Sequence, residues 1–298
     1  MRPIFVVLLS AGILSGSALT TAAKAADVTQ KQETTTMSEV KINGPQGKLT
    51  TISSKSPGRP QVLFVHADPG QASQWVQVMK ALGPDADMVA FDARGAGSSD
   101  AARNGEYSYG ARATDIEAVA KSAGFDRFFL VAHSAGSAVA LHYAADHADL
   151  VRGIYMLDPL LNPASLPPNV RDGMIAGLEG PKADEFWMGH VASIAGDNKA
   201  IVDGALSSAR RVIPDARIGF TKAMLSWDAK VALNAYNGPM FILSTPATDN
   251  PAALYNVRTD ILHGVASSRG HWLQLDQPDM VANSIRKFLD SNKGQNDR

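Results

Sequence analysis

The sequence predicts an α/β fold with a mostly parallel, doubly wound sheet and an inserted helical cap. Short, nearly unbroken apolar runs recur along the chain, as in strands buried on both faces. Stretches with helical spacing separate these runs, and such alternation builds a parallel sheet with helices on both sides. One interval, residues 159–238, has helical spacing without a convincing strand, which favours an inserted cap over a loop.

The predicted elements follow in order along the chain. A hairpin or a pair of edge strands comes first, because two short runs flank Asn43 and Gly44. The buried strands are expected at residues 61–66, 88–91, 128–132, 154–157 and 240–243. Helices are expected at residues 73–82, 110–123 and 136–147 in the core, 182–194, 199–212 and 220–234 in the cap, and 279–289 near the end. The core therefore comprises residues 38–158 and 239–290.

Bulk composition limits the partners of the chain. Its 298 residues carry a formal net charge of -1, which offers no broad attraction for nucleic acid or anionic membrane. There is no cysteine, so disulfides, thiolate nucleophiles and cysteine-bound metals are excluded. No P-loop, dinucleotide fingerprint or zinc-ligand spacing occurs. We expect no cofactor and no metal.

The first 25 residues have the layout of a secretory signal peptide. Arg2 precedes an apolar run over residues 4–14, and Ala23-Lys24-Ala25 resembles a cleavage site. The run is shorter than a membrane span of about 20 residues. We expect export to the periplasm or medium without stable membrane insertion. Residues 26–37 and 291–298 are polar and are expected to be a flexible lead-in and tail.

Ser134 is the candidate nucleophile. It directly follows the predicted strand at 128–132, and small residues open the next helix. A serine hydroxyl needs this exposure on a tight strand-turn-helix elbow, the context of the G-x-S-x-G motif. Ala132 stands where the motif has its first glycine. An N-cap serine is the alternative for the pentapeptide taken alone.

Several motifs in order resemble the α/β-hydrolase superfamily, in particular its serine esterases. They are His66-Ala67-Asp68-Pro69-Gly70 after the first buried strand, Asp92-Ala93-Arg94-Gly95-Ala96-Gly97 after the second, the Ser134 elbow, and Arg269-Gly270-His271-Trp272 near the end. The first resembles the oxyanion loop, with Ala67 in place of a glycine, and the last resembles the loop of the catalytic histidine. Asp92, Arg94 and the turn glycines are interpreted as structural.

The resemblance implies a Ser-His-Asp triad with His271 as the general base. The acid is expected after the strand at 240–243, where Asp249 is the only carboxylate. Asp158 is the alternative, because some members carry the acid after the preceding strand. Chain order favours Asp249.

The resemblance also implies an oxyanion hole formed by the backbone N–H groups of Ala135 and Asp68. The Asp68 carboxylate is unexpected there, since it opposes the developing negative charge unless it points away or is paired. His133, beside the nucleophile, either touches substrate or supports the turn. Trp187 and Trp227 are candidates for lining a substrate pocket, although such residues more often form cap core.

The leading hypothesis is a hydrolase for a small or medium, mainly apolar ester or a lactone. Superfamily members that attack alkyl halides or epoxides carry Asp at the elbow, whereas this chain has Ser134. The resemblance therefore implies acyl chemistry through an acyl-enzyme. Alternatives on the same triad are carbon-carbon bond hydrolysis, amide hydrolysis and a perhydrolase-like side activity. A non-catalytic ligand-binding protein is the alternative from another class, favoured by Ala67 and Ala132.

Overall fold

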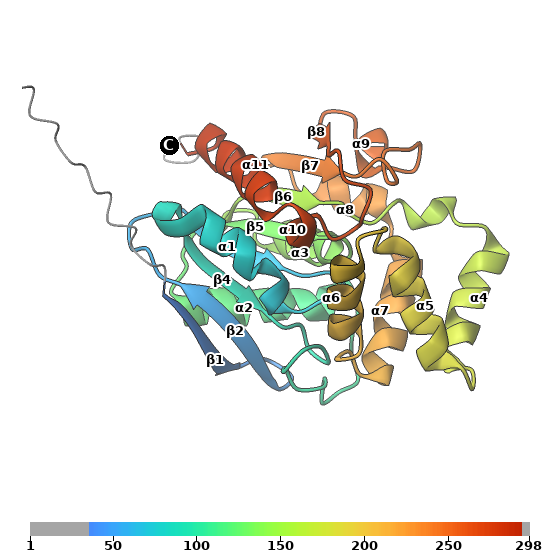
Figure 1. Ribbon diagram of the computed structural model, residues 1–298. Coiled ribbons are helices and arrows are strands. Elements are labelled where there is room, and N and C mark those ends of the chain that lie inside the picture. The colour runs from blue at the N-terminus through green and yellow to red at the C-terminus, as the bar shows by residue number, and fades with distance from the viewer. Residues whose placement is uncertain (1–35, 294–298) are drawn as a thin grey trace, which may run out of the picture. The chain divides into compact units, whose positions relative to one another are not determined.

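The computed structural model describes residues 36–293, which are built around one eight-stranded sheet (Figure 1). The expected signal peptide, most of the lead-in and residues 294–298 lie outside the described residues. The strand order is β1-β2-β4-β3-β5-β6-β7-β8. Their bounds are β1 Met37–Asn43, β2 Lys48–Ser54, β3 Gln61–Val65, β4 Asp87–Phe91, β5 Phe128–His133, β6 Val151–Leu157, β7 Met240–Ser244 and β8 Leu262–Val265.

The sheet is parallel from β4 to β8, while β2 runs antiparallel to both β1 and β4. The expected hairpin of β1 and β2 is thus present, and β2 extends it into the main sheet. The predicted class, a mostly parallel sheet with helices and a helical insert, is confirmed.

Helices cover both faces of the sheet because alternate strand residues point to opposite sides (Figure 1). In β5, Leu130 and Ala132 belong to one buried cluster, and Phe129 and Val131 belong to the other. The first cluster includes residues of α2 (Tyr109–Ala123), α3 (Gly136–Asp146) and α8 (Ala229–Ala235). The second includes residues of α1 (Val76–Leu82) and α11 (Pro278–Ser291).

The insert between β6 and β7 is helical, as expected. It holds α4 (Pro168–Glu179), α5 (Ala183–Ile194), α6 (Lys199–Ala209), α7 (Pro214–Ser226) and α8. Side chains from α4 to α7 form a third buried cluster, which includes Trp187, Val191, Ala205 and Phe220. Trp272 of the core belongs to the same cluster, so the cap packs on the loop that carries His271.

Two features differ from the sequence expectation. The single helix predicted for residues 220–234 is two helices, since Trp227 is extended and the Asp228 side chain caps α8 by accepting from the Val231 amide at 3.0 Å. Strand β8 was not predicted. It is short, lies at the sheet edge and exposes Leu262 by 73%, so it lacks the continuous apolar pattern of the inner strands.

Candidate active site

Ser134 lies on a tight turn between β5 and α3. Its φ is 52°, and its amide donates to the Leu157 carbonyl at 3.0 Å, which fixes the turn to the end of β6. A Cβ at Gly136 would lie 2.7 Å from the His66 carbonyl oxygen, so the start of α3 requires glycine. Ala132, where the motif has its first glycine, is fully buried and fits between strand and helix. The expected elbow geometry is present.

Asp158 follows β6 and is bonded to His271. Its Oδ2 accepts from His271 Nδ1 at 2.5 Å, while its Oδ1 accepts from the Thr245 amide at 2.8 Å and from the Thr248 hydroxyl. Burial favours the protonated acid, but the hydrogen bonds outweigh it and hold the pKa of the Asp158 carboxyl below its usual value. The carboxylate therefore stays ionised beside the imidazole.

This arrangement corrects the prediction from the sequence, which favoured Asp249 over Asp158 as the partner of His271. Asp249 does lie in the loop after β7, but its carboxylate accepts a hydrogen bond from the Tyr255 hydroxyl. Burial, together with that bond, raises the pKa of Tyr255 to about 12. Asp249 thus fastens its own loop, and the carboxylate next to His271 comes from the preceding strand.

His133 supports the histidine loop from inside the core. It is completely buried, its Nε2 donates to the His271 carbonyl at 2.9 Å, and its Nδ1 accepts from the Gln274 side chain at 3.0 Å. Loss of solvation, followed by repulsion from His271, holds the pKa of His133 well below its ordinary value of 6.5. Of the two roles open for His133, the structure favours support of the turn, because a buried neutral imidazole joins elbow and loop.

The amides of Ala135 and Asp68 lie on the turns expected for an oxyanion hole. Neither appears as a donor in the hydrogen bonds of residues 36–293, so both N–H groups are available. The loop that holds Asp68 is fixed by His66, which donates from Nδ1 to the Ala67 carbonyl at 2.6 Å and accepts from the Ala93 amide at 2.8 Å. The Asp68 carboxylate is paired with Arg112 at 2.7 Å.

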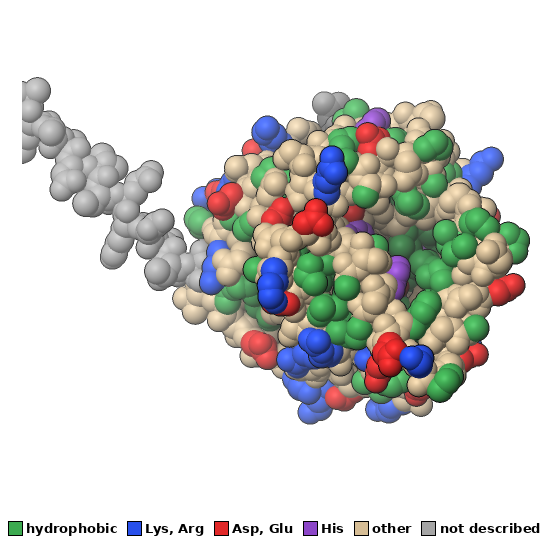
Figure 2. Space-filling view, turned by 45° about the vertical axis from the view of Figure 1, so that its right-hand side comes forward, with side chains coloured by type: hydrophobic (Ala, Val, Ile, Leu, Met, Phe, Trp, Pro, Cys, Tyr) green, Lys and Arg blue, Asp and Glu red, His purple; other side chains and the backbone are tan. Residues whose placement is uncertain are grey.

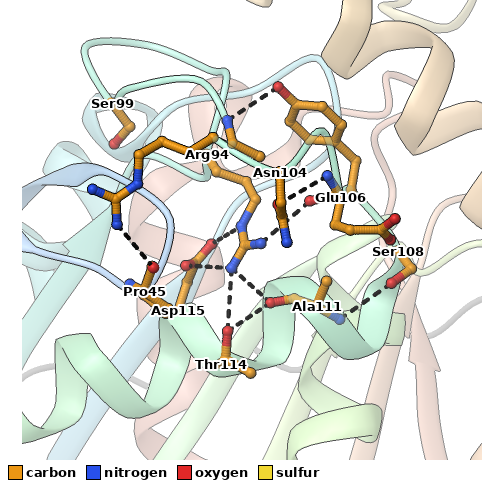
Figure 3. A network of polar contacts seen from close by, with 12 residues as sticks. Pro45, Arg94, Ser99, Asn104, Glu106, Ser108, Ala111, Thr114 and Asp115 are labelled. Carbon is orange, nitrogen blue, oxygen red and sulfur yellow. Dashed lines mark hydrogen bonds and ion pairs between the residues drawn. The ribbon is translucent and has the colours of Figure 1, made fainter.

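The turn after β4 is structural, as expected. Arg94 makes a bidentate ion pair with Asp115, at 2.7 and 2.8 Å, and bonds the Glu106 and Ala111 carbonyls (Figure 3). Asp92 accepts from the Ala72 and Ser98 amides at 2.7 Å. These two side chains are occupied in holding the turn, so neither is free for chemistry.

The two candidate pocket residues of the cap region are mostly buried. Trp187 donates from its indole nitrogen to the Ala209 carbonyl at 3.0 Å within the cap core. Trp227 packs edge-on against Tyr109. In both cases the contacts are those of core side chains.

His190 on cap helix α5 lies within electrostatic range of His271. Loss of solvation and, second, repulsion from His271 lower the pKa of His190 on α5. The cap also reaches the site through the His271 amide, which donates to the Ile194 carbonyl at 3.1 Å. Only the fold brings these cap residues together with the histidine loop, so no local sequence signal marks His190.

A hollow opens on the face shown in Figure 2, and hydrophobic and histidine side chains border it. Within residues 36–293, no group of three or more acidic or histidine side chains is arranged to hold a metal ion. The same residues contain no helix that is both long and apolar enough to cross a membrane.

The eight-stranded sheet with its helical insert is the architecture of one fold family. A family model described as the alpha/beta hydrolase fold matches residues 60–278, and the chain belongs to that family.

Relatives with known names match smaller parts of the chain. It is 32% identical over 117 residues to a soluble epoxide hydrolase of Corynebacterium sp. (strain C12), covering 39% of each chain. It is 33% identical over 103 residues to a fluoroacetate dehalogenase of Burkholderia sp., covering 33% of this chain and 34% of that one. The chain thus spans about two fifths or less of the length of these curated relatives.

Solved structures share the fold over most of the chain. An esterase from Thermogutta terrifontis with malate bound superposes with a TM-score of 0.73 at 20% identity, covering 85% of this chain and 98% of that one.

Proposed function

We propose that the chain is a serine hydrolase that cleaves carboxylic esters, lactones included, through an acyl-enzyme. The observation that carries this proposal is the Asp158–His271 hydrogen bond beside the Ser134 elbow. An imidazole held by a buried carboxylate at Nδ1 presents Nε2 as a base, which is what a serine nucleophile requires.

Each group has a defined step in the proposed reaction. Ser134 Oγ attacks the ester carbonyl while His271 Nε2 takes its proton, and the amides of Ala135 and Asp68 donate to the new oxyanion. The intermediate expels the alcohol, which receives the proton from His271. Water, activated by the same imidazole, then hydrolyses the acyl-enzyme. Asp158 keeps the Nδ1 proton in place and stabilises the imidazolium.

The nucleophile supports acyl chemistry over the reactions named in the two curated relatives. An epoxide hydrolase and a dehalogenase attack a saturated carbon, and members with that chemistry carry Asp at the elbow, whereas residue 134 is serine. We assign the hollow in Figure 2 to the substrate, and its hydrophobic border then favours a mainly apolar acyl or alcohol group.

A fluorophosphonate probe tests the proposal directly, because it reacts covalently with an activated serine. We expect one label per chain in the wild type and none in Ser134→Ala. Hydrolysis of p-nitrophenyl esters of graded chain length, with lactones and matched amides alongside, then identifies the preferred class. A folded wild type that neither labels nor turns over any of these compounds would refute the enzyme and leave the ligand-binding alternative.

We also propose export, with residues 1–25 removed as a signal peptide. The proposal rests on the charge, the apolar run and the Ala23-Lys24-Ala25 site at the start of the chain.

A further inference from the structure

Arg112 on α2 is a buried cation with a single hydrogen-bond partner among the described residues. Its guanidinium donates from Nη1 to Asp68 at 2.7 Å, while Nε and Nη2 have no partner. Its side chain is 2% exposed, and that of Asp68 is 13% exposed. The buried pair carries a large desolvation cost, so stability alone does not account for it.

Two aromatic rings fix the position of the guanidinium. Its central carbon lies 4.0 Å from the ring centroid of Phe220 on cap helix α7 and 5.8 Å from that of Tyr109 on α2. A cation beside aromatic faces is attracted by their quadrupoles. Arg112 therefore touches the cap, the core helix and the oxyanion loop at once.

The charge of Asp68 makes this contact relevant to catalysis. Its amide is one of the two proposed oxyanion donors, and an unpaired carboxylate on the same residue would oppose the negative charge of the tetrahedral intermediate. In a site that excludes water such repulsion is poorly screened. The Arg112 guanidinium neutralises the Asp68 carboxylate through their ion pair.

We infer that Arg112 is a positioning residue that neutralises Asp68 and holds the oxyanion loop beneath cap helix α7. The inference rests on the proposed serine hydrolase function. An unpaired Asp68 carboxylate opposes the charge of the transition state and not the bound ester. Loss of the Arg112 guanidinium therefore lowers kcat more than it changes KM.

Three variants test the inference with p-nitrophenyl ester turnover. Arg112→Gln keeps a polar side chain without the charge, and we expect kcat to fall roughly 10- to 100-fold, approaching the loss of one oxyanion donor. Arg112→Lys keeps the charge and should retain most of kcat. Asp68→Asn combined with Arg112→Gln removes both charges and should recover most of the loss, because removing both partners of a pair leaves no orphaned charge.

Arg217→Gln is the matched control. Arg217 is a second largely buried arginine, on α7, and it is paired with Asp184 within the cap. We expect its kcat to equal that of the wild type. Fluorophosphonate titration of Ser134 normalises every kcat to folded, active enzyme, so partial unfolding of a variant does not obscure the result.

The inference is overturned if Arg112→Gln matches Arg217→Gln in kcat, or if the double variant is no faster than Arg112→Gln. Absence of both turnover and Ser134 labelling in the wild type would instead refute the proposed function on which it rests.

Discussion

At the scale of single residues, backbone strain coincides with the proposed chemistry. Within residues 36–293, Ser134 and Asp158 are the two non-glycine residues with positive φ, at 52° and 41°. Such a conformation costs an L-residue about 1–2 kcal/mol. Hydrogen bonds from their amides to Leu157 and Leu243, at 3.0 and 2.7 Å, hold both residues at the ends of neighbouring strands. Strain of this kind is typical of functional sites.

Two matched amide substitutions test which carboxylate is the acid of the proposed triad. Asp158→Asn preserves shape but removes the acceptor that fixes the Nδ1 proton of His271, so kcat should fall about 10⁴-fold, as for other triads. Asp249→Asn removes only a partner of Tyr255, so kcat should change less than about threefold. Initial rates on one p-nitrophenyl ester measure both effects. The reverse ranking of the two variants would restore Asp249 as the acid.

His133 should make stability depend on pH. Its pKa is held well below 6.5 in the folded chain. Below about pH 6.5, His133 therefore binds a proton in the unfolded chain but not in the folded chain. This contribution to stability is complete above that pH and is lost as the pH falls, by at most about 1.4 kcal/mol per unit.

The variant His133→Leu lacks this titration. Urea unfolding between about pH 5 and 7 should therefore show a shallower loss of stability in the variant than in the wild type. At neutral pH the variant should be less stable by roughly 2–4 kcal/mol, because the Gln274 amide and the His271 carbonyl lose their buried partner. Parallel pH curves for the two proteins would contradict the role of His133.

The sequence singled out Ser134 and His271 as candidates, but it did not predict which carboxylate pairs with His271. Ser134 is marked by a local pattern of strand, turn and small residues. The choice between Asp158 and Asp249 depends on which carboxylate reaches Nδ1 of His271 across three strand ends, and no local pattern records that distance. The pairing of Asp68 with Arg112, 44 positions apart, could not be predicted from the sequence for the same reason.

At the scale of elements, burial decided which strands could be predicted. Strands β3 to β7 are covered by helices on both faces and consist of apolar runs, whereas β8 lies at the edge with an exposed Leu262. The break between α7 and α8 depends on one side chain. Asp228 caps α8, but helical spacing continues across it, and so the sequence predicted one helix there.

Removing the Asp228 side chain from the start of α8 should lower the stability of the protein. Asp228→Ala leaves the Val231 amide without its acceptor and should lower the free energy of unfolding by about 1 kcal/mol. Lys230→Ala, at an exposed position of the same helix, is the control and should change it by less than about 0.5 kcal/mol. Urea denaturation followed by circular dichroism gives both values. Equal stability of the two variants would show that the Asp228 side chain does not stabilise α8.

At the scale of the whole molecule, parallel strands gather the site from distant parts of the chain. Asp68, Ser134 and Asp158 follow the carboxyl ends of β3, β5 and β6, which are neighbours in the sheet. Side chains at these positions lie together at one edge of the sheet, which is where ligands bind in open α/β sheets. The cap closes over this edge through Phe220 and the Ile194 carbonyl. Residues that are far apart in the sequence therefore lie close together in the fold, because each follows a neighbouring strand.

The proposed export predicts a particular mature chain. Expression of the full sequence in a bacterium with a general secretion pathway should yield periplasmic or secreted protein whose first residue is Ala26, because cleavage follows Ala23-Lys24-Ala25. Mass spectrometry of the intact purified protein measures this. Ala23→Asp and Ala25→Asp place charge at the two small-residue positions and should leave the precursor uncut. Since the strands of the described sheet begin at Met37, the mature chain should retain the full proposed ester hydrolase activity. Cytoplasmic accumulation of uncut wild type would contradict the signal peptide and leave the proposed triad untouched.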